Sequence, residues 1–238
     1  MRVVVLTGAG ISAESGVATF RDNGGLWEGH RVEDVATPEA FDAQPHVVHM
    51  FYDLRRAALE TVHPNPAHEA LARLEEHLGD DFLLVTQNVD DLHERAGSER
   101  VLHMHGSLLS ALCTECGGRS RWSGPLGHGP ACPRCESAAL RPDVVWFGEV
   151  PHGLQDIDEA LRAADVFCSI GTSGAVYPAA GFVVAARRYG ARTVELNLEP
   201  GAGSSHFDES GYGPASRVVP LWVREMVRRG RPPSPHLT

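Results

Sequence analysis

Near its start the chain reads RVVVLTGAGISAESG, from Arg2 to Gly16, where an apolar run leads directly into a loop with two closely spaced glycines. The run predicts a buried strand, and Gly8 and Gly10 let backbone amides approach a pyrophosphate at the start of a helix. Ser12 and Ser15 add hydroxyl donors to the same loop. A tight connection between a strand and a helix explains such a turn about as often as a nucleotide does. The stretch therefore predicts the first unit of an α/β fold and leaves nucleotide binding open.

Beyond this stretch, short apolar or β-branched runs alternate with helical patterns. The predicted strands are Arg2 to Leu6, Phe82 to Thr86, Val144 to Phe147, Asp165 to Ile170, Arg192 to Leu198 and Arg217 to Val219. The predicted helices are Pro45 to Glu60, Pro66 to Leu78 and Pro178 to Tyr189. This alternation is typical of a parallel sheet covered by helices on both faces, with ligands beyond the carboxyl ends of its strands. We therefore predict a Rossmann-like α/β fold.

Two segments interrupt the alternation. Residues 29–62 contain a helix, and residues 112–141 are rich in glycine, proline and cysteine with little apolar periodicity. We expect these two insertions to form a small domain beside a Rossmann-like domain made of residues 1–28, 63–111 and 142–238. The tail from Gly230 is expected to be disordered, and the sequence contains no internal repeat.

The composition limits the class of protein. With 238 residues and 42% hydrophobic content, the chain is long enough for one large core with a small satellite. Its formal charge of -10 would repel a phosphate backbone, so nucleic acid is a poor partner and a basic, lysine-bearing partner suits it better. The longest apolar runs are far too short to cross a membrane, and none follows a basic start. We expect a soluble, monomeric protein of the cytoplasm.

Four of the five cysteines form two tight pairs. Cys113 and Cys116, then Cys132 and Cys135, are Cys-X2-Cys knuckles separated by fifteen residues. This spacing predicts a zinc ribbon, and four thiolates fill a tetrahedral shell, so the metal should be structural. Disulfides or an iron-sulfur cluster are the alternatives. Cys168 lies in a predicted strand and is expected to be a buried, small apolar residue.

Two further segments favour a dinucleotide. ATFRDNGGLW, from Ala18 to Trp27, places an arginine and aromatic residues in a glycine-rich loop that can cover a bound dinucleotide. The strand in ARTVELNLE brings Asn197 and Glu199 to its carboxyl end on the same side, where they can bind ribose hydroxyls. A solvated strand end is the alternative interpretation of that pair.

Two polar segments carry candidate chemistry. TQNVDD, from Thr86 to Asp91, follows a predicted buried strand and so lies where ligands bind, although asparagine and aspartate there commonly cap the next helix. HMHGS offers His103 and His105 on the same side of an extended segment, and either imidazole can act as a base near neutral pH.

Together these motifs resemble the sirtuin family of NAD-dependent protein deacylases, in the family's order: TGAGISAESGVATFR, TQNVDDLHERAG, HMHGS, the cysteine pairs, RPDVVWFGE, IGTSGAVYPAAG and VELNLEP. The resemblance extends from Val3 to about Val219 and is highly specific as a set. One departure is Ala18, where the family usually has proline; it removes no chemical group. The resemblance implies NAD as co-substrate, one structural zinc ion, and acylated lysine side chains of proteins as substrates.

The resemblance also implies a mechanism. The acyl oxygen of a modified lysine attacks the ribose carbon of NAD as nicotinamide leaves, and His105, which precedes glycine as the family's base does, deprotonates the ribose hydroxyls. Asn88 and Gln87 orient the nicotinamide ribose and Asp90 holds the carboxamide. The products are free lysine, nicotinamide and O-acyl-ADP-ribose.

The implied contacts extend over several segments. The NAD contacts are Gly8, Ala9, Gly10, Ser12, Ser15, Phe20, Arg21, Trp27, Gln87, Asn88, Val89, Asp90, Gly171, Thr172, Ser173, Asn197, Leu198, Glu199 and Ala215. WFGE and SGAVYP resemble the segments between which the family clamps its peptide as an added strand. The implied substrate contacts there are Val145, Phe147, Gly148 and Glu149.

The helix bearing FYDLRR suggests which acyl group is removed. Its expected core face consists of Val47, Met50, Phe51, Leu54 and Ala58. Tyr52 and Arg55 share the flank beside that face, and a phenol with a guanidinium suits a carboxylate, although an ordinary solvated flank is the alternative on spacing alone. By resemblance, this pair marks the sirtuin branch that removes malonyl, succinyl and glutaryl groups. We therefore expect desuccinylation and demalonylation alongside deacetylation.

Three other functions compete with this interpretation. An ADP-ribosyltransferase would use the same NAD pocket and the same glycosidic cleavage. A hydride-transferring dehydrogenase would leave the TQNVD and HMHG segments without a role. A zinc-ribbon module that binds nucleic acid would account for only about thirty residues and conflicts with the negative charge.

Overall fold

The computed structural model describes residues 1–18, 26–27 and 29–230 of the chain. In this part, six strands form one parallel sheet in the order β11-β10-β9-β1-β4-β5. These strands are β1 (Val3–Thr7), β4 (Phe82–Thr86), β5 (Val101–His103), β9 (Val166–Ile170), β10 (Arg192–Asn197) and β11 (Glu209–Tyr212). The chain first builds outward from β1 through β4 to β5, then returns to the other side of β1. Because the order reverses there, the crevice between β1 and β9 is where such sheets bind ligands.

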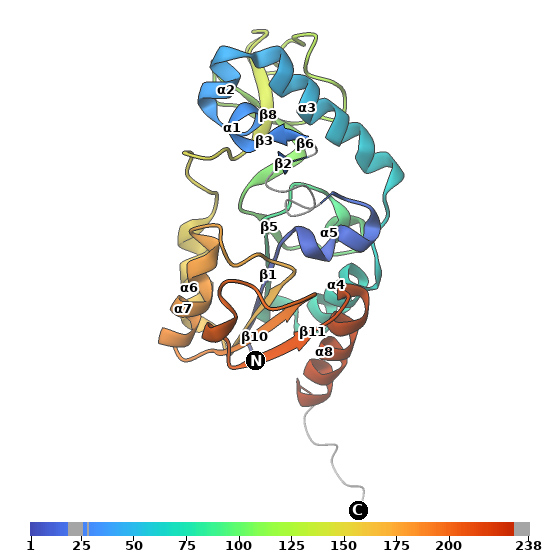
Figure 1. Cartoon of the computed structure of the whole chain (residues 1–238), viewed down its shortest axis with the longest axis vertical. Helices are drawn as coiled ribbons and strands as arrows, with labels where there is room; N and C mark the ends of the chain where they lie inside the picture. Colours follow the sequence, from blue (N-terminus) through green and yellow to red (C-terminus); the bar gives the residue numbers. More distant parts are fainter. Residues whose placement is uncertain (19–25, 28, 231–238) are drawn as a thin grey trace, which may run out of the picture.

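Helices cover both faces of this sheet (Figure 1). α4 (Pro66–Leu78) and α8 (Ala215–Gly230) pack on one face, and α6 (Leu154–Ala163) and α7 (Phe182–Arg188) pack on the other. Within β1 the side chains alternate between the two cores, as Val5 belongs to the first and Leu6 to the second. The predicted fold class, a Rossmann-like parallel sheet covered on both faces, is confirmed.

The remaining elements gather at the opposite end of the molecule from α8 (Figure 1). They are α1 (Val32–Val35), α2 (Pro38–Ala43), α3 (Pro45–Ala58), the hairpin of β2 (Leu26–Trp27) and β3 (His30–Arg31), and an antiparallel sheet of β6 (Gly106–Cys113), β7 (Arg119–Arg121) and β8 (Leu140–Val144). Two separate cores support them, one under α3 and one among the cysteines. The short helix α5 (Leu92–Arg95) lies between this group and the large sheet.

The helix predictions are largely confirmed. Pro66 to Leu78 matches α4, which begins at the predicted proline because Asn65 caps it and accepts a hydrogen bond from the backbone of Ala67. The helix expected from Pro45 ends as α3 at Ala58 and continues as a 3₁₀ turn, Leu59–Thr61. The helix expected from Pro178 consists of a 3₁₀ turn, Ala179–Gly181, followed by α7.

Two strand predictions are wrong. The strand expected from Val144 to Phe147 is displaced, because β8 ends at Val144 and the following residues pair irregularly, with Phe147 N donating to Ala36 O. The segment from Arg217 to Val219 belongs to α8. Its valines favour a strand locally, but residues 219, 222, 223 and 226 form a helical stripe buried against α4 and the sheet.

None of the helices within the described residues has the length and apolar content needed to cross a bilayer. The expected disordered tail lies outside the described residues from position 231 onward, as do Phe20, Arg21 and the side chain of Trp27.

Candidate active site

The loops that follow β1 and β9 pack backbone against backbone. Gly8 N donates to Ile170 O at 3.0 Å, and Gly10 N donates to Gly171 O at 2.9 Å. A Cβ atom at Gly10 would lie 2.8 Å from the Cα of Gly171, and one at Gly171 would lie 2.5 Å from Ile11 N. Gly171 also has a φ of +62°, which disfavours other residues. The glycines therefore allow the two loops to pack against each other at the switch point, where sheets of this kind bind ligands.

The other residues predicted to contact NAD along β10 gather at the same edge. Asn197 Nδ2 donates to Thr172 O at 2.8 Å, and Asn197 Oδ1 accepts from Leu198 N at 3.0 Å. Leu198 and Glu199 are exposed beyond the strand end. Asn197 thus fixes the loop of Thr172 and Ser173 to the carboxyl end of β10.

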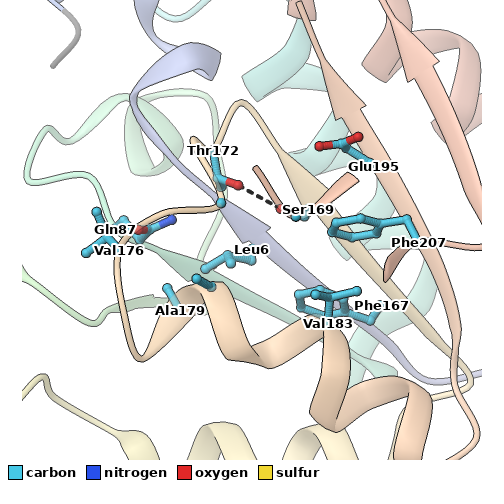
Figure 2. Close-up of a pocket in the computed structure, with 13 residues that line it drawn as sticks. Leu6, Gln87, Phe167, Ser169, Thr172, Val176, Ala179, Val183, Glu195 and Phe207 are labelled. Atoms are coloured by element: carbon cyan, nitrogen blue, oxygen red, sulfur yellow. Dashed lines mark hydrogen bonds between the residues drawn. The ribbon is translucent and has the colours of Figure 1, made fainter. Parts of the chain in front are cut away.

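A pocket adjoins these loops on the α7 side of the sheet (Figure 2). Gln87 and Val176 line one side of it, and Glu195 and Phe207 line the other. The hydroxyls of Ser169 and Thr172 lie 3.0 Å apart at its edge. The structure therefore brings the predicted residues Gln87 and Thr172 to one cavity. The sequence interpretation missed Glu195, although its separation of two from Asn197 places both on one face of β10.

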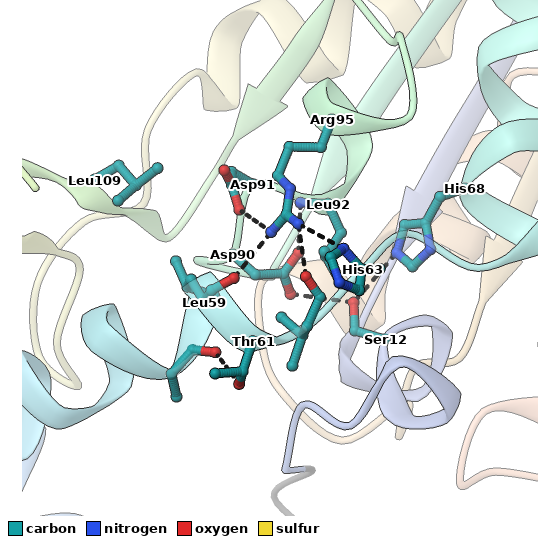
Figure 3. Close-up of polar contacts among 12 residues, drawn as sticks. Ser12, Leu59, Thr61, His63, His68, Asp90, Asp91, Leu92, Arg95 and Leu109 are labelled. Carbon is teal, nitrogen blue, oxygen red and sulfur yellow. Dashed lines mark hydrogen bonds and ion pairs between the residues drawn. The ribbon is translucent and has the colours of Figure 1, made fainter.

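A buried polar chain joins the first loop to the TQNVDD segment (Figure 3). Ser12 Oγ donates to Asp90 Oδ2 at 3.1 Å and accepts from Asn88 Nδ2 at 3.2 Å. Burial raises the pKa of Asp90. The other oxygen of Asp90 accepts from Leu92 N at 3.1 Å, so this carboxylate also holds the first residue of α5. One serine hydroxyl therefore sets the orientation of both candidate nicotinamide-side residues.

His68 completes this chain and was missed by the sequence interpretation. Its Nε2 lies 3.3 Å from Ser12 Oγ (Figure 3), and its Nδ1 accepts from the backbone N–H of Asn65 at 3.2 Å. Because Nδ1 is an acceptor, the ring proton lies on Nε2 and donates to Ser12. Burial lowers the pKa of His68 to about 4, so the ring is neutral at physiological pH.

The two histidines of HMHGS differ in their surroundings. His105 Nδ1 donates to Gln87 O at 3.2 Å, and burial lowers its pKa, with the charge of His152 acting in the same direction. His103 Nδ1 donates to Asn88 O at 3.0 Å, and its Nε2 lies 2.6 Å from Glu94 Oε1. Burial alone would lower the pKa of His103, but Glu94 and the carbonyl of Asn88 outweigh it and raise the pKa. His105 is therefore the neutral imidazole, suited to accept a proton at Nε2.

Arg95 ties the end of α3 to this segment (Figure 3). Its NH1 donates to Leu59 O at 2.9 Å and its NH2 donates to Val62 O at 2.6 Å. The guanidinium also lies 3.6 Å from Asp91 Oδ1. These bonds satisfy the carbonyls of Leu59 and Val62, at the two ends of the 3₁₀ turn that follows α3, and they fix α5 against that turn.

The WFGE segment is braced from within. Glu149 accepts from Trp146 N at 2.8 Å and from Arg141 NH2 at 2.8 and 3.0 Å. Val145 N donates to His105 O at 2.9 Å, which joins this turn to the histidine segment. Gly148 has a φ of +93°, and Phe147 is 49% exposed beside it. The turn is thus rigid, with an apolar side chain presented to solvent.

The core face predicted for α3 is right at Phe51, which is buried, and wrong at Met50, Leu54 and Ala58, which are exposed. Met50 and Leu54 are 54% and 65% exposed, whereas Tyr52 and Arg55 are buried. Tyr52 Oη accepts from Trp146 Nε1 at 3.1 Å, a bond that lets the phenol enter the core. Burial raises the pKa of Tyr52, so the phenol is neutral.

Arg55 folds back over its own helix. Its NH1 donates to Phe51 O at 2.7 Å, and its guanidinium carbon lies 3.1 Å from the centroid of the Phe51 ring. The structure therefore brings Tyr52 and Arg55 to the inner side of α3, and a solvated flank is excluded.

The four paired cysteines form a compact cluster. Their Sγ atoms all lie within 4.8 Å of one another, with 3.6 Å between Cys113 and Cys135 and 3.8 Å between Cys116 and Cys132. A tetrahedral zinc with Zn–S bonds of about 2.3 Å has an S–S edge of about 3.8 Å. The donor set fits zinc, whereas the S–S distances exclude disulfides, and Cys168 is buried in β9 as expected.

The other predicted NAD contacts lie around the first loop. Ser15 Oγ accepts from Asn65 Nδ2 at 3.0 Å, and the backbone of Val89 accepts from Leu108 N at 2.8 Å. Ala9 begins the 3₁₀ turn after β1, and Ala215 begins α8. Glu14 of the first loop accepts from Ser216 N and its hydroxyl, which fixes the start of α8 beside the loop.

Comparisons with known proteins agree with this arrangement. A protein named NAD-dependent protein deacylase from Yersinia pseudotuberculosis serotype I (strain IP32953) is 58% identical over 228 residues, which cover 94% of this chain and 82% of that protein. The solved Sir2 homolog–NAD complex is 41% identical with a TM-score of 0.86, over 96% of this chain and 90% of that one. Sir2Af2 bound to a myristoylated histone peptide is 35% identical with a TM-score of 0.74, over 96% and 91%.

The family model described as the Sir2 family matches residues 8–178, from the first glycine loop to the proline after the SGAVY segment. This range contains the polar chain, both histidines and all four zinc-ribbon cysteines. The resemblance to sirtuins is confirmed, and the chain belongs to the Sir2 family.

Proposed function

We propose that this chain is an NAD-dependent protein-lysine deacylase. The observation that carries the proposal is the neutral imidazole of His105 at the ligand-binding edge of the sheet, next to the Asn88–Ser12–Asp90 chain. Relatives that share most of its length are named NAD-dependent protein deacylase. When bound, NAD supplies the ADP-ribose group that accepts the acyl chain, and nicotinamide and O-acyl-ADP-ribose are the products.

The chain's own residues have separate tasks in this reaction. His105 accepts a proton at Nε2 from a ribose hydroxyl, while its Nδ1–H bond to Gln87 O holds the ring in place. Asn88 and Asp90 orient the nicotinamide side, and Ser12 keeps both in register. The close contact of the loops at Gly8, Gly10 and Gly171, where no side chain intervenes, leaves room for the pyrophosphate. Thr172, Ser173, Asn197, Leu198, Glu199 and Ala215 surround the adenosine side.

Zinc has a structural task in this proposal. Four thiolates complete its shell, so it has no open position for substrate or water. It holds the end of β6 to the turn at Cys132 and Cys135, and the ribbon has few other buried apolar groups. The small domain would consist of residues 29–62 and 112–141.

The acyl group is the finer part of the proposal. Tyr52 and Arg55 would bind the carboxylate of succinyl and malonyl chains, while neutral acetyl groups use the same site without that contact. A charge-assisted hydrogen bond is worth about 1.5 to 3 kcal/mol, which corresponds to about ten- to hundredfold in preference. We further propose that the enzyme is monomeric and cytoplasmic. Its substrates are proteins and not nucleic acid, since the net charge of -10 disfavours binding to a phosphate backbone.

Mass spectrometry of three lysine peptides tests the function. Acetyl-, succinyl- and malonyl-lysine peptides are incubated with the protein and NAD, and we expect free lysine and O-acyl-ADP-ribose from each. His105→Ala should abolish turnover, whereas His77→Ala, at an exposed site on α4, should not. Transfer of ADP-ribose to an unmodified protein, with no deacylation, would favour the ADP-ribosyltransferase alternative. Arg55→Met should lose desuccinylation selectively, and equal loss on all three peptides would refute the acyl-selectivity role.

A further inference from the structure

The zinc ribbon is fastened to α3 by one carboxylate. Asp53 Oδ1 and Oδ2 accept from Leu126 N at 2.9 and 3.0 Å, and Oδ2 also accepts from Gly127 N at 2.9 Å. Leu126 and Gly127 lie in the fifteen-residue segment between the two cysteine pairs. Asp53 itself lies on α3, one residue after Tyr52 and two before Arg55. The helix that carries the acyl-recognition pair is therefore bonded directly to the ribbon.

Arg56 strengthens the connection between α3 and the ribbon. Its side chain is only 2% exposed; NH1 donates to Asp53 Oδ1 at 2.6 Å, and Nε donates to Leu108 O on β6 at 2.6 Å. Strand β6 ends at the zinc-ribbon residue Cys113. Asp53 and Arg56 thus connect α3 to the ribbon by two routes, the first through the backbone of residues 126–127 and the second through β6.

The ribbon end of the connection depends on the metal core. Leu126 is fully buried in the cluster that contains Cys113 and Cys132. Its side chain is held by the ribbon core and its N–H by Asp53. Loosening of the ribbon on metal loss would displace this backbone, and Asp53 would then lose its bonds to Leu126 and Gly127.

We propose that Asp53 is a positioning residue that couples the zinc ribbon to acyl recognition by Tyr52 and Arg55. This inference rests on the proposed role of that pair in binding acidic acyl groups. Coupling of this kind is reciprocal, so a ligand that engages the pair must also stabilise metal binding.

The chemistry at position 53 requires a carboxylate. Both oxygens face donors, namely two backbone N–H groups and a guanidinium, so an amide would turn its own NH₂ toward another donor. Asp53→Asn keeps the size of the side chain and removes the charge that Arg56 pairs with. Asp42→Asn, at an exposed site on the neighbouring α2, is the matched control.

The first readout is zinc release from the loaded protein to a colorimetric chelator. We expect release from Asp53→Asn to be about tenfold faster than from wild type, since a charge-assisted bond is replaced by weaker ones. Asp42→Asn should match the wild type. Circular dichroism of each variant before chelation shows whether it is folded.

The second readout needs only the wild-type protein and therefore does not depend on how a variant folds. A saturating non-hydrolysed succinyl-lysine analogue, supplied with ADP-ribose, should slow zinc release several-fold, and an acetyl-lysine analogue should slow it less. In Asp53→Asn the difference between the two ligands should vanish, and KM for the succinyl peptide should rise more than KM for the acetyl peptide.

The outcomes separate this inference from the proposed function. The coupling is refuted, and the function stands, if wild type removes succinyl groups through Arg55 while two other results are negative. These are a rate of zinc release that the ligand does not change, and an Asp53→Asn variant that behaves as wild type. If wild type removes no acidic acyl group, the role of the Tyr52–Arg55 pair fails, and the coupling fails with it.

Discussion

Buried His68 makes the stability of the protein depend on pH by an amount that the structure allows to be worked out. Burial lowers its pKa to about 4 in the folded protein, from 6.5 for a free histidine. Between these values the unfolded chain binds more protons than the folded one, so the free energy of unfolding falls as the pH is lowered. One such group costs about 2 kcal/mol on going from neutral pH to about pH 5, and about 3 kcal/mol when titration is complete.

The test is urea denaturation of wild type and His68→Gln at about pH 7.5 and about pH 5. Glutamine keeps a donor for Ser12 but does not titrate, so the difference in unfolding free energy between the two pH values should shrink by about 2 kcal/mol. His93, whose pKa is also lowered by burial, remains in both proteins. His46→Gln, at an exposed site of α3, controls for loss of a histidine. An unchanged difference in His68→Gln would mean that His68 is charged or solvated in the folded state.

Three further outcomes are expected. In His152→Leu the pKa on the acidic limb of kcat/KM should rise, because after burial the charge of His152 is what lowers the pKa of His105; coincident pH–rate profiles would contradict this. Chelation should remove about one zinc per chain and unfold the ribbon before the sheet, since metal binding at such sites contributes about 10 to 16 kcal/mol to folding; loss of hydrogen-exchange protection in a single step over ribbon and sheet together would refute this. Tyr52→Phe should lower the free energy of unfolding by about 1 to 3 kcal/mol in urea, because the buried Trp146 Nε1 loses its acceptor; a change below about 0.5 kcal/mol would exclude that role.

The main strands could be predicted because each is a short apolar run buried on both faces. Phe82 to Thr86 matches β4 without error, and α4 matches because Asn65 and Pro66 mark its start. That the glycine loop and Gly171 lie at one edge also follows, since both come after parallel strands. Their backbone contact could not be predicted, because it requires β9 to lie beside β1, and neither segment indicates the order of the strands in the sheet.

The inner face of α3 could be predicted only in part from hydrophobicity, which correctly places Phe51 in the core. The rule that apolar residues face the core places Met50 and Leu54 inside, yet both are exposed. Tyr52 is buried instead because its hydroxyl meets Trp146, a partner 94 positions away. The role of Asp53 could not be predicted either, since its partners are backbone N–H groups of a loop that is distant in sequence. Contacts that depend on distant backbone leave no periodic signal in the sequence.

The choice between the two histidines of HMHGS shows what geometry adds to a motif. Both direct Nδ1 at a main-chain carbonyl, His103 at Asn88 and His105 at Gln87, so the hydrogen bond at Nδ1 does not distinguish them. They differ at Nε2, which in His103 lies 2.6 Å from a carboxylate oxygen of Glu94. That carboxylate favours the protonated ring, and a protonated ring has no lone pair with which to accept a proton. His105, whose pKa is lowered by burial, keeps its lone pair at neutral pH, which supports our proposal of His105 as the general base, with His103 bonded to the backbone of Asn88.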